Sequence, residues 1–556
     1  MHRLCLVLLL LLLNIQCLLA APVYDENKRL NLSASCPDSS CRLWGLQSDY
    51  QQALHYSGGQ VLPLQALLLG NCLMRALPLE LFRLTPNLHS LQVLNCSTYH
   101  VSREHFQALP QLRQLMLQRN KIARLSGQLF GSLRQLQVLQ LDQNIIQLVP
   151  AQAFEGLTQL QVLGLQGNGI SELMAGAFAP LANLVHLDLS DNEITHMDAK
   201  TFERNSKLQT LLLRGNSLAE FEPNSLAALP GLRLLDLSEC ELHELPELRL
   251  LGAQTLRLEG SGVQRLIIDG GVINLLAGNN ALTQLSIGDK SAVIELDLHA
   301  NQLSGNVTSA LLLGMWNLQR LDLAKNNIDA LTSGSSSSAL LLPSLTQLNL
   351  AHNQLRSLPP DAALWPPQLT QLDISFNHLL TVTAEGLATL PRLQRLHMEG
   401  TRLQEFDHEL FHRQHQHLQE LGICDTELSF PRMHRVMIYL SDRGVHLPLR
   451  CLQRPESGNI DARAVPPTEL AALDAVPVQA RAGVTGIHPY WTTRDILALL
   501  TLMTVFIILL IQLYHILDEE GCLRRMRLWL TGRQPARVNG TRSRRLNEQD
   551  SESSSD

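Results

Sequence analysis

The chain has little charge and few aromatic side chains. Of its 556 residues, 17% are charged and 4% are aromatic, and the formal net charge is −7. Because binding to phosphate backbones needs a clearly basic surface, this balance argues against nucleic acid as a main partner. The 45% of hydrophobic residues instead suits a protein with a large buried core.

Catalytic and metal-binding motifs are also missing. The sequence contains neither H-E-x-x-H nor G-x-S-x-G, and the segment 288–291 lacks the paired glycine of a phosphate-binding loop. Four histidines lie close together without a cysteine or a carboxylate pair, and we favour a solvated face over a metal site for them: His408, His412, His415 and His417. We therefore expect a protein that is not an enzyme and that needs no cofactor.

What the chain does have is a repeat. Six phenylalanines follow one another at intervals of 24 residues: Phe82, Phe106, Phe130, Phe154, Phe178 and Phe202. Beside them runs the pattern L-x-x-L-x-L-x-x-N-x-L, as in residues 112–122. We count 16 repeats, which start near residues 64, 88, 112, 136, 160, 184, 208, 232, 253, 272, 293, 318, 345, 369, 393 and 418.

This pattern resembles the leucine-rich repeats of extracellular proteins over about residues 60–450. The resemblance implies an α/β, β-rich solenoid shaped as a horseshoe, with a parallel sheet on its concave side. Inward leucines fill the core, and the asparagine at the ninth position satisfies backbone groups of the turn. The repeats starting at 232, 253 and 272 shorten to 21, 19 and 21 residues, and 332–338 reads as an inserted surface loop. Each irregularity is either a ligand site or a tolerated change.

Both ends of the chain predict a membrane protein. We assign residues 1–20 to a signal peptide, 21–63 to an N-terminal cap region and 64–452 to the solenoid with its C-terminal cap. A Pro/Ala-rich stalk follows at 453–495, and the uncharged segment 496–517 is long enough to form one transmembrane helix. Arginines after it place the disordered tail, 518–556, in the cytoplasm. We expect a single-pass type I protein of the plasma membrane with an extracellular N-terminus.

Cysteines of the predicted ectodomain fall into three pairs and one leftover. Cys36 and Cys41 resemble part of the family's N-terminal cysteine cap, which usually has four cysteines. Cys424 and Cys451 flank the last partial turn and are predicted to close a C-terminal cap. Cys72 and Cys96 occupy the ninth position of adjacent repeats, where a disulfide and two buried thiols in place of asparagine are equally acceptable. Cys240 is expected to be a buried thiol.

Modification sites are predicted on both sides of the membrane. Three sequons lie in the predicted ectodomain, at Asn31, Asn95 and Asn306. Cys522, just past the span, is a candidate for palmitoylation or part of a simple stop-transfer anchor. Ser553 in the acidic end of the tail suits an acidophilic kinase.

Outward-facing strand residues supply the ligand-binding candidates. Aspartates recur at the fifth position of the repeat, where a structural role is favoured over a preference for basic ligands: Asp188, Asp236, Asp297, Asp322 and Asp373. The repeats starting at 208–253 carry mixed charges where the period shortens, and we predict the centre of the ligand footprint there. Its candidate residues are Arg214, Arg233, Asp236, Glu239 and Arg257.

The whole chain resembles animal leucine-rich-repeat adhesion molecules and co-receptors, with a Toll-like ectodomain but without a Toll-type signalling tail. The tail of 39 residues is too short for an independent signalling domain. The resemblance implies cell-surface recognition of a protein ligand or a neighbouring receptor, with output through a cytoplasmic adaptor or a partner chain. A decoy that occupies ligand without signalling and a structural adhesion protein are the alternatives.

Overall fold

The structure is a computed structural model that describes residues 30–447 with gaps. Its chain separates into two units, 1–458 and 459–556, and all the described residues lie in the first. The gaps are 32–34, 37–38, 49–55, 58–60, 198–199, 223–225, 227, 243–247, 251–252, 305–310, 331–341, 359–364, 383–386 and 388–389.

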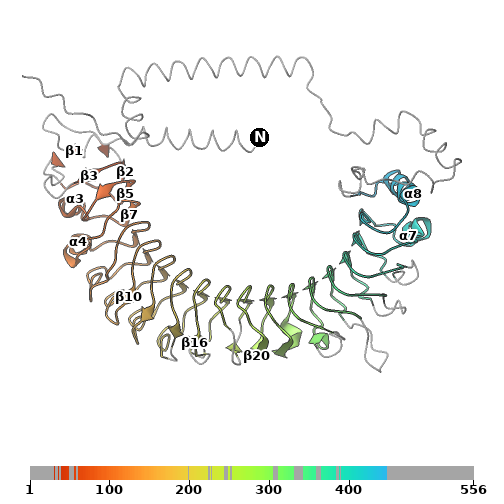
Figure 1. Ribbon diagram of the computed structural model, residues 1–556. Helices are drawn as coiled ribbons and strands as arrows, with labels where there is room; N and C mark the ends of the chain where they lie inside the picture. The colour runs from red at the N-terminus through yellow and green to blue at the C-terminus, as the bar shows by residue number, and fades with distance from the viewer. Residues whose placement is uncertain are drawn as a thin grey trace, which may run out of the picture. The chain divides into compact units, whose positions relative to one another are not determined.

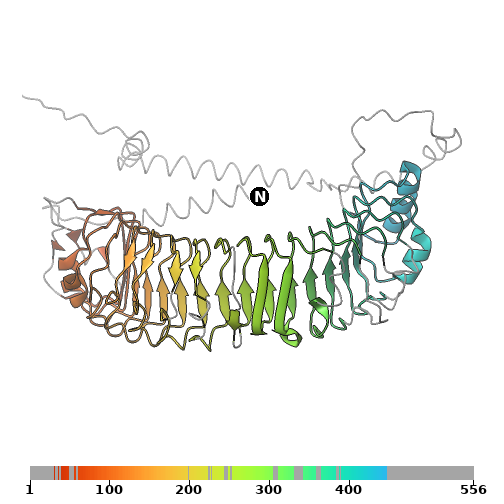
Figure 2. The same ribbon diagram turned by 60° about the horizontal axis from the view of Figure 1, so that its bottom comes forward.

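A long parallel sheet runs through the first unit and lines the inner side of its arc (Figure 1). Each strand pairs with the strand of the repeat before and of the repeat after, from β2 to β28. Figure 2 shows these strands side by side along the unit. They are β2 (Ser40–Trp44), β5 (Ala66–Gly70), β7 (Ser90–Leu94), β8 (Gln114–Met116), β9 (Val138–Gln140), β11 (Val162–Gly164), β13 (His186–Asp188), β15 (Thr210–Leu212), β17 (Leu234–Asp236), β19 (Thr255–Arg257), β21 (Asn274–Leu276), β23 (Glu295–Asp297), β24 (Arg320–Asp322), β25 (Gln347–Asn349), β26 (Gln371–Asp373), β27 (Arg395–His397) and β28 (Glu420–Gly422).

The leucine pattern sets the register of this sheet. Leu115, Leu139, Leu163 and Leu187 are directly paired on consecutive strands, and each is fully buried. A strand begins two residues after each predicted repeat start from 64 to 418. β2 adds one more strand, inside the segment that we assigned to the cap region. The predicted leucine-rich solenoid with a parallel sheet is therefore confirmed.

Asparagines at the ninth position connect neighbouring repeats. The Nδ2 of Asn144 donates to the carbonyl oxygens of Leu117 and Leu141 at 2.9 and 2.8 Å, and its Oδ1 accepts from the backbone nitrogen of Ile122 at 3.1 Å. The same pattern recurs at Asn192, Asn216 and other rungs. Each side chain thus satisfies donors and acceptors that the turn would otherwise leave buried and unpaired.

The outer side of the arc changes along the chain. In the regular repeats the phenylalanine column is fully buried, with ring centroids of Phe154, Phe178 and Phe202 6.1 and 5.8 Å apart. Two-stranded pairs accompany it: β10 (Leu148–Val149) with β12 (Glu172–Leu173), and β14 (His196–Met197) with β16 (Glu220–Phe221). In the shortened repeats a three-stranded sheet takes its place: β18 (Leu248–Leu250), β20 (Arg265–Gly271) and β22 (Gln284–Asp289). Figure 1 places β10, β16 and β20 on the outer side.

Shorter elements complete the described part of the chain. Near the N-terminus the parallel pairs are β1 (Leu30–Asn31) with β4 (Tyr56–Ser57), and β3 (Gln47–Ser48) with β6 (Leu73–Met74). The helices are α3 (Leu79–Leu84), α4 (Arg103–Gln107), the 3-10 turn η2 (Lys290–Ala292), α7 (His408–Gln414) and α8 (Phe430–Ser441). α7 and α8 pack against one another beside the last strand.

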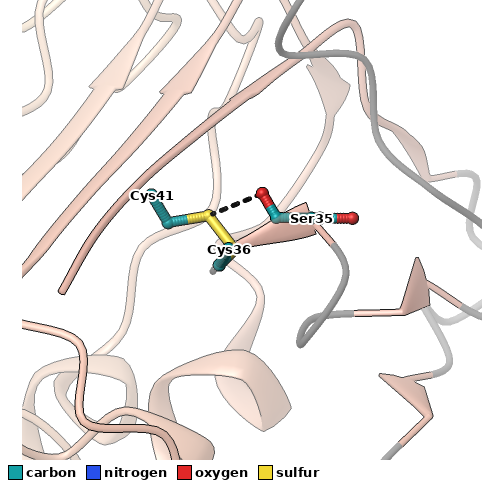
Figure 3. The surroundings of a disulfide bond; sticks show 3 residues. All are labelled: Ser35, Cys36 and Cys41. Carbon is teal, nitrogen blue, oxygen red and sulfur yellow. Dashed lines mark hydrogen bonds between the residues drawn. A yellow bond between two sulfur atoms is a disulfide. The ribbon is translucent and has the colours of Figure 1, made fainter. Parts of the chain in front are cut away.

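One disulfide involves β2, the first strand of the long sheet, and other cysteines take positions in the asparagine ladder. Cys36 and Cys41 form a disulfide next to Ser35 (Figure 3), and Cys41 belongs to β2. Cys424 is disulfide-bonded, while its predicted partner Cys451 lies outside the described residues. The two interpretations of the remaining pair are resolved in favour of thiols, because Cys72 and Cys96 are free and buried, as is Cys240.

These thiols replace the asparagine of their rungs. The Sγ of Cys96 accepts from the backbone nitrogen of Cys72 at 3.3 Å and lies 3.4 Å from the carbonyl oxygen of Leu94. The hydrogen bond between the two side chains raises the pKa of Cys96, and burial adds to the effect. Burial also raises the pKa of Cys240 to about 12. Cys96 and Cys240 therefore stay protonated as hydrogen-bonding thiols.

Several predicted segments lie beyond this description. Within the described ranges no helix is both long and apolar enough to cross a bilayer. The predicted signal peptide 1–20, stalk 453–495, span 496–517 and tail 518–556 all fall outside them, as do the 332–338 loop and the modification sites Asn306, Cys522 and Ser553.

Candidate binding surface on the concave sheet

The concave face carries the side chains at the third, fifth and seventh positions of each repeat. Along β8, β9 and β11 the third and fifth positions are uncharged: Gln114, Met116, Val138, Gln140, Val162 and Gly164. From β23 to β28 the same positions carry glutamates, arginines, aspartates and a histidine, with uncharged Gln347, Asn349, Gln371 and Gly422 between them. The two halves of one sheet therefore offer chemically different surfaces.

A hollow of about 390 Å³ lies over β23 to β27. The third position of these strands contributes Glu295, Arg320 and Arg395 to its walls, and the fifth contributes aspartates, Asn349 and His397. The leucines between them point into the core and close its floor. Five strands from five repeats thus build a polar depression without any insertion in the sheet.

Both arginines of the hollow are held by glutamates of the neighbouring strand. Arg320 and Glu295 approach to 2.6 Å, and Arg395 lies 3.4 Å from Glu420 of β28. These ion pairs are largely exposed, so each contributes less than about 1 kcal/mol of stability. Their main effect is on the charge of the hollow, because the arginines are compensated by glutamates and leave the aspartates at the fifth position without a bound arginine.

The aspartates at the fifth position have a structural role in the strands. In each of the five predicted members of the stripe, Oδ1 accepts from the backbone nitrogen two residues later, at 2.9 to 3.0 Å. This contact ends the strand and fixes the side chain over the concave face. The favoured structural interpretation therefore describes one oxygen of every aspartate, while the second oxygen meets Asn349 at Asp322 and lies beside Arg257 at Asp236.

Burial changes the acidity of Asp322 in the middle of the stripe. It raises the pKa of Asp322, and the nearby charge of Asp297 raises it further, against hydrogen bonds from the Ala324 nitrogen and the Asn349 amide. The Nδ2 of Asn349 lies 2.8 Å from Asp322 Oδ2. A second positive group in the hollow would relieve the repulsion between these carboxylates.

Histidine–carboxylate pairs mark the two ends of the hollow. At β23, His299 Nδ1 is 2.7 Å from Asp297 Oδ1. At β27, His397 Nδ1 is 3.2 Å from Glu399 Oε1. Both pairs lie at the concave surface, and neither was predicted from the sequence, because the residues of each pair are two positions apart and the repeat pattern leaves those positions unspecified.

An exposed aromatic stack lies just after strands β25 and β26. His352 and Phe376 occupy the eighth position of adjacent repeats, with ring centroids 4.3 Å apart and ring planes 7° from parallel. Both have a left-handed backbone, with φ of 55° and 54°, and Phe376 is 45% exposed. Gly400 occupies the eighth position of the next repeat with a φ of 62°, and a Cβ there would collide with the Phe376 ring. The glycine therefore makes room for the ring.

The predicted ligand-binding residues lie together on the surface, but most of their charges are paired internally. Arg214 bonds Glu239 at 2.8 Å, and Arg257 lies 3.7 Å from Asp236, which is only 7% exposed. Arg233 is exposed and precedes β17. The hollow lies further along the sheet than this predicted centre. The sequence signal for it was the charge at the third position of the flanking repeats, in Glu295, Arg320, Arg395 and Glu420.

The histidine cluster near the C-terminus is not simply a solvated face. His415 is fully buried, and its two ring nitrogens are each 2.9 Å from a carbonyl oxygen, that of Phe411 and that of Leu387. His408 and His412 face the ring of Tyr439 edge-on, at 4.9 and 6.0 Å. The prediction is wrong for His415, because this residue fills an interior position between two repeats. In the part of the chain that is described, no group of His, Cys, Asp and Glu side chains could hold a metal ion.

Asn95 of the predicted sequons lies at the rim near the N-terminal end. It follows β7 at the eighth position, is exposed, and has a φ of 53°. Its Nδ2, the atom that a glycan would modify, donates to Asn71 Oδ1 at 2.8 Å. The amide keeps a second hydrogen, so a glycan could replace one without breaking this bond. The backbone of Asn31 belongs to β1.

Comparison with known proteins agrees with this architecture. The leucine rich repeat family model matches residues 86–146, 134–194, 182–242, 317–379 and 343–403. Comparison with the curated proteins gave no significant match. Leucine-rich repeats therefore make up these segments of the chain, and the repeat domain resembles Toll-like receptor ectodomains in fold.

Solved structures with this fold come from several sources. The structure of the Toll–Spätzle complex of Drosophila is 18% identical with a TM-score of 0.52, over 70% of this chain and 57% of that chain. The TLR13–ssRNA13 complex is 21% identical with a TM-score of 0.50, over 71% and 61%. A Leptospira interrogans leucine-rich-repeat protein is 23% identical with a TM-score of 0.47, over 74% and 89%. At these identities the likeness is one of fold, and this chain spans about three fifths of the Toll and TLR13 chains.

Proposed function

We propose that this protein binds a protein ligand through the concave face of its repeat domain, with β23 to β27 at the centre of the contact. The observation that carries the proposal is the hollow itself, which brings glutamate-paired arginines and aspartate carboxylates onto five neighbouring strands, with the exposed His352–Phe376 stack just after two of them. An interface needs apolar anchors among polar groups that can be matched by hydrogen bonds. Phe376 supplies the first, and the hollow supplies the second.

A protein ligand would extend beyond the hollow. A stable protein interface covers about 800 Å² on each partner. Strands lie about 4.8 Å apart, so five strands span roughly 20 Å, and the contact would include neighbouring strands of the same sheet. The fold neighbour Toll was solved with Spätzle and TLR13 with an RNA. For this chain the uncompensated aspartates of the hollow favour a protein with basic groups over a polyanion.

We also propose that the protein acts at the plasma membrane as a recognition protein or co-receptor. The predicted signal peptide, single span and short tail support a type I topology, with an adaptor or a neighbouring receptor carrying the output. An epitope added after Asp556 is expected to stain permeabilised cells only. Staining on intact cells contradicts the topology without affecting the binding site.

Deletion of residues 518–556 separates the alternatives. A co-receptor that signals through its tail loses activity in this variant, although ligand still binds to the cell. A decoy keeps its inhibitory effect, and a structural adhesion protein keeps its adhesive effect. The measurement is ligand binding and cellular response, with surface expression of both chains matched.

The ligand itself is sought by screening purified extracellular proteins on cells that display the full chain. For any protein that binds, Asp322→Asn with Asp373→Asn is expected to weaken binding at least tenfold, because both carboxylates face the hollow. The matched variant is Arg214→Glu, Arg233→Glu and Arg257→Glu, which alters the centre first predicted from the sequence. Loss of binding in this triple variant alone would move the footprint to β15–β19 and contradict the proposed centre.

A further inference from the structure

His397 stands at one end of the hollow among carboxylates. Its Nδ1 is 3.2 Å from Glu399 Oε1. β26 contributes Asp373 on one side, and β28 contributes Glu420 on the other. Arg395, on the same strand as His397, is 3.4 Å from Glu420. The charged groups that face the imidazole from its own strand and from both neighbouring strands are therefore three carboxylates and one paired arginine.

This environment favours the protonated imidazole. The hydrogen bond with Glu399 raises the pKa of His397 against the opposite effect of burial, and the charges of Glu399, Asp373 and Glu420 raise it further. Burial acts to raise the pKa of Glu399, but the hydrogen bond with His397 leaves it below its ordinary value. The proton of His397 is therefore exchanged at a pH above the ordinary histidine value of about 6.5.

We infer that the hollow accepts a lysine or arginine side chain of its partner while His397 is neutral, and releases it when His397 becomes protonated. This inference rests on the proposed function and adds to it the chemistry of the ligand and the regulation of binding. The repeat domain would then bind at neutral pH and release its ligand in a mildly acidic compartment.

The charge balance of the hollow explains the coupling. With a neutral His397, the carboxylates of Asp373 and Glu399 have no internal cation beside them, so a cation from the partner is attracted. When His397 is protonated, its imidazolium forms an ion pair with the Glu399 carboxylate and repels a second cation. Binding of the partner's cation and protonation of His397 oppose one another. The bound cation therefore lowers the pKa of His397, and the free energy of that shift equals the free energy by which the proton weakens binding.

The sign and limit of the effect follow from this linkage. Affinity is full above the raised pKa of His397 and falls as the pH drops through it. One proton changes the affinity by at most a factor of about ten for each pH unit, and a displacement of about one pKa unit on binding gives about a tenfold total change.

The histidine–carboxylate pair that follows β23 has a different arrangement. His299 Nδ1 is 2.7 Å from Asp297 Oδ1, and its Nε2 is 3.0 Å from Nδ2 of Asn279. Both ring nitrogens of His299 therefore already have a side-chain partner. His397 has a carboxylate partner at Nδ1 and further carboxylates on both neighbouring strands, so it is the group that the pH dependence is expected to follow.

The test uses the purified full-length chain in detergent and a fluorescein-labelled acetyl-tetralysine amide as the cationic probe. Fluorescence anisotropy at fixed low ionic strength gives Kd at pH 7.5 and at pH 5.5. We expect binding about tenfold weaker at pH 5.5 for the native chain. His397→Gln is expected to reduce the difference to less than twofold, whereas His186→Gln, a matched histidine on β13 outside the hollow, is expected to retain it.

Each other result overturns the inference in a distinct way. Equal affinity at both pH values, or a pH effect that survives His397→Gln, shows that this histidine does not control binding. Unchanged binding at pH 7.5 in the Asp322→Asn, Asp373→Asn variant shows that the peptide sits elsewhere, and no binding at either pH shows that the hollow does not take a cation. None of these results decides whether a protein ligand exists, which the cell-surface screen tests separately.

Discussion

The regular repeats from 64 to 231 and the shortened repeats from 232 to 292 build the same inner sheet on different outer layers. In the first region the convex side is filled by stacked phenylalanines, and in the second by the strands β18, β20 and β22. The inner strands β15, β17, β19 and β21 nevertheless pair without a shift in register. The length of a repeat is therefore a property of its outer layer, while the binding face depends only on the eleven-residue leucine pattern.

The difference also shows how a surface can vary within a fixed frame. The inward leucines of both regions are buried to a similar extent, whereas the concave residues between them differ, from Gln114 and Gln140 in the regular repeats to the Asp236–Arg257 pair in the shortened ones. Function can therefore change from repeat to repeat without a cost in packing. Four predictions test this separation, in order of expected size.

Phe178→Ala is expected to give the largest effect, a loss of about 3–5 kcal/mol in unfolding free energy, because two stacked rings lose their partner and a cavity remains. Ile268→Val in the outer sheet of the shortened repeats is expected to cost about 0.5–1.5 kcal/mol. Urea unfolding monitored by circular dichroism measures both. A small effect at Phe178 would contradict the dependence of the regular repeats on the aromatic column.

Asn168→Leu tests the ladder that both regions share. Its Nδ2 donates to the carbonyl oxygens of Leu141 and Leu165 at 3.1 and 2.9 Å, and its Oδ1 accepts from the Ile146 nitrogen at 3.1 Å. Leaving these groups unpaired is expected to cost about 1–3 kcal/mol. Gln161→Leu, an exposed change in the same repeat, serves as the control. Equal stability of the two variants would show that the asparagine has no structural role.

Gly400→Ala tests the left-handed eighth position at the rim. An L-residue in this conformation costs about 1–2 kcal/mol, and the new methyl group also meets the Phe376 ring. In a Phe376→Ala background the backbone cost remains but the collision is removed, so Gly400→Ala should be less damaging there. Thermal unfolding of the four chains in this cycle gives the interaction. Additive effects would mean that the ring moves aside without cost.

The smallest effect concerns the His397–Glu399 pair. The raised pKa of His397 adds stability that is present at low pH and lost as the pH rises through that pKa, above 6.5. The lowered pKa of Glu399 adds stability above its unfolded value and loses it as the pH falls through the folded value, below 4.5. The pair should therefore stabilise the domain most between about pH 4.5 and 6.5, by less than about 1 kcal/mol. Comparing the Tm of the native chain and His397→Gln from pH 4 to pH 8 measures it, and a constant difference across that range contradicts the assignment.

The sequence was sufficient to predict the inner sheet because each of its constraints is local. The leucines at fixed spacing can be buried only in one register, and the asparagine rungs follow from the same eleven residues. The positions of residues such as Asn144 and Leu139 therefore follow from the repeat pattern alone. The disulfide between Cys36 and Cys41 was also predicted, although the sequence did not show that Cys41 already belongs to a strand of the sheet.

The candidate site was harder to predict because it depends on pairs of residues in different repeats. Arg214 and Arg257 were selected for their charge, and only the structure shows that Glu239 and Asp236 already compensate them. The structure likewise shows that Arg320 pairs with Glu295, so Asp322 has no arginine partner in the hollow. His415 was misjudged for a similar reason, since its carbonyl partner at Leu387 lies 28 residues earlier in the chain.

The uninterrupted register across repeats of unequal length has a consequence for how such a chain can change over generations. Leu139 pairs with Leu163 and Leu115 in the way that Leu348 pairs with Leu372 and Leu321. Removing residues 136–159 would join strands whose partners are chemically equivalent, so duplication or loss of a whole unit preserves the frame. A gene encoding this domain can thus lengthen, shorten or reposition its recognition surface by recombination, without a new folding problem to solve.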